Sequence, residues 1–146
     1  MRDRVTVRKI GHVLPVSIAL VVGTLAWASQ REGNDPAAPW EAPPEAKSKP
    51  NPVPFSPEVL AEGKVLYQKN CELCHGASGR GDGPATKFVK PAPADITAAA
   101  AQSGMTDGEL FWKLTEGRAP MPPYGKKLSE HERWVLVHYV RSLRVD

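Results

Sequence analysis

Apolar side chains recur at helical spacing in the C-terminal part of the chain. The first such segment follows Ser56-Pro57, a pair suited to the N-cap and the first position of a helix. Val59, Gly63 and Tyr67 then lie one helical turn apart, and the pattern continues to Cys71. A glycine inside a helix costs about 1 kcal/mol relative to alanine. Gly63 therefore indicates the close approach of a second helix.

Two capping boxes predict two further helices. The box at 106–109 opens a helix that ends at Gly117, and the box at 129–132 opens a helix that reaches Leu143. The last helix has a broad apolar surface that needs a partner, and the Gly63 face of the first helix is the expected one. The pattern predicts an all-α domain over residues 58–146. The apolar residues of the last helix are Trp134, Leu136, Val137, Tyr139, Val140 and Leu143.

Residues 1–31 have a different pattern, a basic start followed by an apolar stretch. Two interpretations stay open. One is a cleaved secretory signal, with Ala26-Trp27-Ala28 as the small-residue cleavage site before Ser29. The other is an uncleaved signal-anchor, because the 19 residues from Ile10 to Ala28 are about the minimum that spans a bilayer. Both interpretations place residues 32–146 on the periplasmic or external side.

Residues 32–57 are rich in proline, with eight prolines between positions 34 and 57. This composition predicts a stiff, extended spacer that reaches roughly 70 Å at about 3.1 Å per residue. Such a spacer suits a domain held at a membrane, so it favours a single N-terminal membrane helix over cleavage. The expected organisation is a signal-anchor or signal peptide at 1–31, a linker at 32–57 and a globular domain at 58–146.

The net charge of +3 comes from the N-terminal end of the chain. Residues 1–11 hold four basic residues and one acidic residue, a net charge of +3. Residues 58–146 hold twelve Lys or Arg and eleven Asp or Glu, a net charge of +1. Because the basic surplus is not part of the globular domain, the charge excludes a nucleic-acid-binding face.

The two cysteines of the chain stand in Cys71-Glu72-Leu73-Cys74-His75, at the end of the first expected helix. The pattern C-x-x-C-H is the attachment sequence of a covalent c-type haem. The thiols add to the two vinyl groups of the porphyrin, and the histidine lies beneath the iron as an axial ligand. A redox dithiol would need a preceding βαβ pattern. A zinc site would need two more ligands, and His131 and His138 have an unsuitable spacing.

A methionine enclosed by prolines, Pro120-Met121-Pro122, lies between the last two expected helices. Core methionines normally belong to an apolar helical stripe, whereas here the prolines fix the backbone and orient one sulfur. Thioether sulfur is a haem ligand that raises the reduction potential, so Met121 is the expected second axial ligand. Met105 is the weaker choice, and a bis-histidine site would use His131 or His138.

Two loops are expected to contact the haem. Residues 76–84 contain four glycines, and a carbonyl near Pro84 is the expected partner of the second ring nitrogen of His75. Residues 91–95 form a second rigid loop, which either packs over the haem edge or serves as a linker. For the haem propionates, Arg118, Trp112, Tyr124 and Trp134 remain open choices.

Together these residues resemble the class I cytochromes c over residues 56–144. The resemblance rests on Gly63-x3-Tyr67-x3-Cys71-x2-Cys74-His75-Gly76, on Met121-Pro122 and on the terminal pattern from Trp134 to Leu143. The segments 79–84, 93–97 and Met121-Pro122-x-Tyr124 are most similar to the monohaem subunits of alternative complex III and related membrane-bound cytochromes. The resemblance implies a class I cytochrome c fold, in which N- and C-terminal helices cross around one covalent haem c. It also implies His75/Met121 ligation, with Cys71, Cys74, Pro84 and Tyr124 as further haem contacts.

A haem with both axial positions filled transfers electrons and binds no small-molecule substrate. We therefore expect an electron-transfer protein rather than an enzyme, acting as a membrane-tethered subunit or carrier of a respiratory or photosynthetic chain. Its expected partners are a quinol-oxidising complex or cytochrome as donor, and an oxidase, reductase or reaction centre as acceptor. The expected location is the bacterial inner membrane, with the haem domain in the periplasm, or the soluble periplasm after cleavage at Ala28. The alternative function is a haem enzyme or gas sensor with an open distal site.

Overall fold

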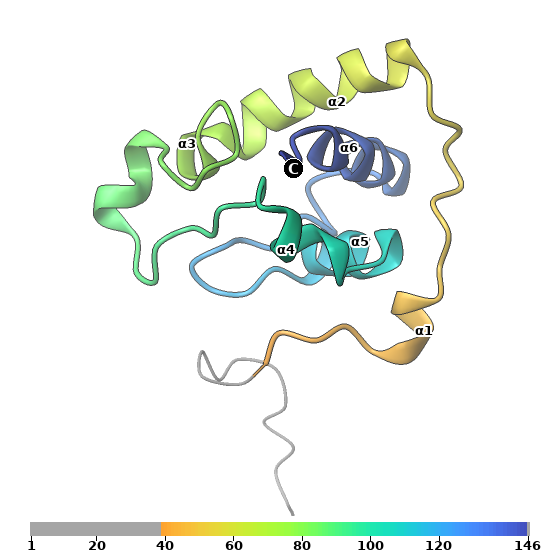
Figure 1. Cartoon of the computed structure of the whole chain (residues 1–146), viewed down its shortest axis with the longest axis horizontal. Coiled ribbons are helices and arrows are strands. Elements are labelled where there is room, and N and C mark those ends of the chain that lie inside the picture. The colour runs from red at the N-terminus through yellow and green to blue at the C-terminus, as the bar shows by residue number, and fades with distance from the viewer. Residues whose placement is uncertain (1–38, 146) are drawn as a thin grey trace, which may run out of the picture. The chain divides into compact units, whose positions relative to one another are not determined.

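The computed structural model describes residues 39–145, in which helices are joined by loops (Figure 1). Two isolated β-bridges are the only extended pairing in this part of the chain, which confirms the all-α class for it. No helix within 39–145 is long and apolar enough to cross a membrane. The expected signal-anchor lies outside the described residues. The elements are α1 (Pro44–Lys47), α2 (Pro57–Asn70), α3 (Glu72–His75), the 3₁₀ turn η1 (Pro84–Phe88), α4 (Ala99–Ser103), α5 (Asp107–Glu116) and α6 (Glu130–Ser142).

The first and last long helices, α2 and α6, pack against each other at Gly63. A Cβ atom added at Gly63 would lie 2.8 Å from the Cβ of Tyr139 and 3.0 Å from the carbonyl oxygen of Val135. Such distances exclude a larger residue unless one helix moves. Next to this contact, the rings of Tyr67 and Tyr139 pack with their centroids 5.1 Å apart. The close approach predicted from Gly63 is confirmed.

Helix α6 forms the centre of the core. Val135, Leu136 and Val137 have no exposed surface. On the side of α6 that faces α5, Trp134 stacks on Phe111 with ring centroids 4.0 Å apart. Helix α6 therefore joins α2, which leads into the cysteine motif, to α5, which leads into the Met121 loop.

In both predicted capping boxes the N-cap residue, Thr106 or Ser129, caps its helix, but only one box is complete. The Ser129 hydroxyl accepts a hydrogen bond from the backbone N–H of Glu132, and the Glu132 carboxylate accepts one from the N–H of Ser129. At α5 the Thr106 hydroxyl accepts from the N–H of Glu109. The reciprocal half predicted there is wrong, because the Glu109 carboxylate instead lies 2.9 Å from Nζ of Lys113, one turn later.

Residues 39–57, here called the strap, are packed on the helical domain rather than extended away from it. Figure 1 shows the strap running along the domain from α1 to the start of α2. Helix α1 packs against α5, with Ala46 buried between them. The carbonyl of Lys47 accepts a hydrogen bond of 2.8 Å from the Thr106 hydroxyl.

The second half of the strap is bound to α6. The Asn51 side-chain amide donates a 3.1 Å hydrogen bond to the carbonyl of Trp134, and Nε2 of His138 lies 2.7 Å from the carbonyl oxygen of Val53. Val53 itself belongs to the hydrophobic core. The expectation of a free spacer is therefore wrong for residues 39–57. Buried side chains and side-chain-to-backbone hydrogen bonds attach this proline-rich segment to α5 and α6.

Candidate functional site

The cysteine motif is one helical turn that continues from α2. The backbone N–H of Cys71 donates to the carbonyl of Tyr67 (2.8 Å), so the turn begins in register with α2. The N–H groups of Cys74 and His75 both donate to the carbonyl of Cys71, at 3.1 Å and 2.9 Å. The two thiols and the imidazole are thereby held on a single turn, as covalent attachment beside an axial ligand requires.

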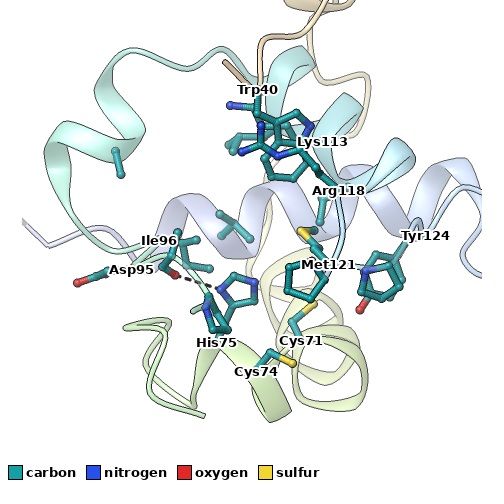
Figure 2. Close-up of a pocket in the computed structure, with 18 of the residues that line it drawn as sticks. Trp40, Cys71, Cys74, His75, Asp95, Ile96, Lys113, Arg118, Met121 and Tyr124 are labelled. Atoms are coloured by element: carbon teal, nitrogen blue, oxygen red, sulfur yellow. Dashed lines mark hydrogen bonds between the residues drawn. The ribbon is translucent and has the colours of Figure 1, made fainter. Parts of the chain in front are cut away.

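These three side chains open into a cavity of about 330 Å³ (Figure 2). Its walls come from the strap, α2, α3, α4, α5, α6, the 89–96 loop and the 118–124 loop. Apolar and proline side chains predominate, which suits a large apolar macrocycle. The aliphatic, proline and methionine residues of the wall are Val89, Pro91, Ala92, Pro93, Ala94, Ile96, Ala101, Met105, Leu110, Leu114, Ala119, Pro120, Met121, Pro122 and Val140.

The imidazole of His75 is oriented by the 91–95 loop. Its Nδ1 lies 3.2 Å from the carbonyl oxygen of Ala94 (Figure 2). Nδ1–H therefore donates to that carbonyl, and Nε2 is the ring nitrogen left to bind a metal. Burial lowers the pKa of His75, so the ring is neutral, the form that ligates iron.

Pro84 does not have the role that the sequence suggested. The structure gives the His75 contact to Ala94, and Pro84 begins η1 outside the cavity wall. The glycine loop instead supports the back of the motif. The N–H of Gly81 donates to the carbonyl of His75 (2.8 Å), and the N–H of Gly83 donates to that of Cys74 (3.2 Å).

Met121 lines the cavity on a loop between α5 and α6. Helix α5 ends at Gly117, whose φ of 62° turns the chain sharply. A Cβ atom there would lie 2.6 Å from the carbonyl carbon of Pro122, so the turn requires glycine. The N–H of Met121 then donates to the carbonyl of Arg118 (2.8 Å), which closes a tight turn and sets the sulfur at the cavity.

Tyr124 fixes the far end of this loop. Its N–H donates to the carbonyl of Leu114 (3.0 Å), and its hydroxyl donates to the carbonyl of Asn70 (2.6 Å), beside the cysteine motif. The ring is buried and lines the cavity. Burial raises the pKa of Tyr124 to about 12, so the hydroxyl remains a donor.

The other suggested iron ligands are placed less favourably than Met121. Met105 lines the same cavity, but its sulfur lies 3.1 Å from Nζ of Lys113. His138 contacts the strap, and His131 lies 4.0 Å from the Glu62 carboxylate. Neither histidine is in the cavity wall. Among residues 39–145, no cluster of three or more His, Cys, Asp and Glu side chains suits a metal ion such as zinc.

The residues present fit a covalent haem. Cys71 and Cys74 are free thiols at the cavity, and burial raises the pKa of Cys71 to about 12. The Asn70 side-chain oxygen and the Gln102 side-chain oxygen are buried at the cavity without a partner in the described structure. The site thus combines two thiols, one neutral imidazole and one thioether around an apolar volume.

The sequence analysis did not identify the polar wall residues Asn70, Gln102 and Lys113, nor the aromatic wall residue Trp40. Trp40, in the strap, lines the cavity together with Arg118 and Tyr124, whereas Trp112 and Trp134 do not. The available signal was a large aromatic residue among prolines. Composition alone assigned that segment to a linker.

A family model described as cytochrome C oxidase, cbb3-type, subunit III matches residues 58–140. Cytochrome c6 of Cladophora glomerata is 27% identical over 89 residues, which cover 61% of this chain and 93% of that protein. Among solved structures, a chain of the reducing HAO-like protein complex of Kuenenia stuttgartiensis is similar, with a TM-score of 0.58 and 32% identity. That likeness covers 66% of this chain and 50% of the other, so this chain spans about half of that one. The strap lies before the family match.

Proposed function

The chain belongs to the family of the cbb3-type cytochrome c oxidase subunit III and is a monohaem class I c-type cytochrome, and from that premise we propose that it transfers electrons with His75 and Met121 as the axial ligands. The observation that carries the ligand assignment is the position of both side chains in one cavity wall, on separate elements. The covalent haem c would supply a one-electron Fe(III)/Fe(II) couple when bound.

Each residue of the site has a defined role in this proposal. Cys71 and Cys74 form the two thioether bonds, and His75 ligates through Nε2 while Ala94 fixes its tautomer. Met121 would supply the second protein ligand, which would leave no position on the metal open to a substrate. The proline-rich wall excludes water, which favours the reduced form and a high potential.

We further propose that the domain is tethered to the inner membrane on the periplasmic side by the apolar segment at 1–31. Because the strap is packed, only residues 32–38 separate that segment from the fixed domain. Seven residues span at most about 25 Å, so the tether is much shorter than the sequence suggested. A domain charge near zero supports partner exchange at high effective concentration rather than long-range steering. The partners are a quinol-oxidising complex or cytochrome as donor and an oxidase, reductase or reaction centre as acceptor.

The experiment that tests the proposal is an optical redox titration of the haem-loaded chain, with and without carbon monoxide. A closed His75/Met121 site predicts a reversible one-electron transition and a reduced spectrum that carbon monoxide does not change. A spectrum that shifts with carbon monoxide would contradict it and support an open distal site, as in a haem enzyme or gas sensor.

A further inference from the structure

The strap places Trp40 in the cavity wall beside two cations. Nζ of Lys113 lies 5.5 Å from the centroid of the Trp40 ring, and the guanidinium carbon of Arg118 lies 5.0 Å from it. Both distances are within the range of about 6 Å for cation–π attraction. Figure 2 shows these three residues gathered at one end of the cavity, while Cys71 and Cys74 lie at the other end.

This end of the cavity holds two cationic side chains. In the described wall, Lys113 and Arg118 are the basic residues, and Nζ of Lys113 also lies 2.9 Å from the Glu109 carboxylate. The acidic residue of the wall, Asp95, belongs to the loop that orients His75 and is far from Trp40 in Figure 2.

The chemistry of haem complements this distribution of charge. Its two vinyl groups and its two propionates stand on opposite halves of the porphyrin. Thioether bonds at Cys71 and Cys74 therefore direct the carboxylates away from the cysteine motif, toward the end of the cavity that holds Trp40. Carboxylates that leave bulk water need cationic or N–H partners, and Lys113, Arg118 and the indole N–H are such groups.

Trp40 belongs to the strap, which lies outside the region that the family model matches. Ala42 and Ala46, which follow Trp40, are 4% and 8% exposed, and Lys47 is hydrogen-bonded to α5. The family match begins at residue 58. The contribution of Trp40 is therefore a property of this chain's N-terminal extension.

We propose that Trp40, Lys113 and Arg118 form the binding site of the haem propionates and that the strap closes it. The cations balance the carboxylates, and the indole ring shields this edge of the haem from water. The inference rests on haem attachment at Cys71 and Cys74. It does not depend on the identity of the second axial ligand.

The test is a double-mutant cycle on the midpoint potential of the haem-loaded full chain, with Trp40→Ala, Arg118→Gln and the double variant. Each single change lowers the potential, because water at the haem edge and loss of a cation both favour the oxidised, more positively charged haem. The double variant shifts less than the sum of the two, because both residues act on the same carboxylates. The matched control is Trp112→Ala, a half-buried tryptophan of α5 outside the cavity wall, which leaves the potential near that of the wild type.

Three results would overturn the proposal. The first is a Trp40→Ala potential equal to that of Trp112→Ala, and the second is a strictly additive cycle. The third is loss of the methionine-to-iron absorption band in Trp40→Ala, because the strap would then act through Met121. If Trp40→Ala yields no haem protein, Trp40→Phe replaces it in the cycle. This variant keeps an aromatic ring but removes the N–H, so a smaller downward shift supports the site and an unchanged potential contradicts it.

Discussion

The two walls of the haem site that carry His75 and Met121 are built from contacts of very different range. On the His75 side, the hydrogen bonds join neighbours: Cys71 to Cys74 and His75, and the 81–86 segment back to Cys74 and His75. The longest of the bonds that support the back of the motif, from the Thr86 hydroxyl to the Cys74 carbonyl, spans 12 residues. The hydrogen bond from Nδ1 of His75 to the carbonyl of Ala94 spans 19 residues, and the other bonds named for this side are local.

The Met121 side depends on segments far apart in the chain. The Tyr124 hydroxyl reaches the carbonyl of Asn70, 54 residues away, and the loop begins from α5, which is itself packed on α6. The sulfur of Met121 is thus placed by the assembled domain. The His75 side therefore depends mainly on local contacts, whereas the Met121 side depends on the packing of distant segments. Changes in tertiary packing should affect the Met121 side first.

The largest effect is expected from removing the His75 side chain. His75→Ala takes away the ligand that the whole turn presents, so nearly all six-coordinate haem should be lost. Optical spectra of the haem-loaded protein measure this. The control is His131→Ala, whose side chain is 60% exposed and outside the cavity. A wild-type spectrum in His75→Ala would contradict the role of His75 as an iron ligand.

The second effect separates the two sides. Gly117→Ala forces a non-glycine residue to a φ of 62° against Pro122, which should cost about 1–3 kcal/mol of unfolding free energy. It should also weaken the methionine-to-iron band while the His75 side persists. Urea unfolding and the optical spectrum report the two effects.

Gly104→Ala is the matched control for this variant. Gly104 has a φ of −88° and no atom within 4 Å of an added Cβ. The free energy of unfolding of Gly104→Ala should differ from that of the wild type by less than about 0.5 kcal/mol. Equal effects of the two glycine substitutions would mean that the Met121 loop does not require glycine at position 117.

A smaller effect compares two hydroxyl groups that donate to backbone carbonyls. Tyr124→Phe removes the long-range bond to Asn70, and Thr86→Val removes the local bonds to Cys74 and Gly81. Each should cost about 1 kcal/mol. Only Tyr124→Phe should also reduce the intensity of the methionine-to-iron band. Thermal melts that follow this band measure both the stability and the band. If Thr86→Val reduced it equally, the distinction between the two sides would fail.

The last effect appears only at alkaline pH. Burial raises the pKa of Tyr124 from 10.0 to about 12. Between these values the folded protein keeps the phenolic proton that the unfolded chain releases, so stability falls as the pH rises from about 10 to about 12. The difference in unfolding free energy between the wild type and Tyr124→Phe should therefore shrink over this range. A constant difference would show that the phenol titrates normally.

The sequence predicted the parts of the fold that local patterns specify. The N-caps at Ser56 and Ser129 and the helix contact at Gly63 are confirmed, because a cap, or a glycine within a helical pattern, is visible in a few neighbouring residues. The haem motif is likewise a contiguous string. Met121 was singled out by its flanking prolines, and the structure places it in the cavity wall.

The errors arose where long-range contacts decide. The partner of His75 is Ala94, 19 residues away, and no local signal distinguishes that carbonyl from those near Pro84. The strap was assigned as a spacer because proline content reports backbone stiffness, whereas the packing of Ala42, Ala46 and Val53 against distant helices decides its position. Trp40 was missed for the same reason.

The assignment of Met121 as the second axial ligand is tested by the methionine-to-iron absorption band of the oxidised protein. The band should be present in the wild type, persist in Met105→Ala and vanish in Met121→Ala, with the haem still covalently attached through Cys71 and Cys74. A band that survives in Met121→Ala, or that is lost in Met105→Ala instead, would contradict the assignment.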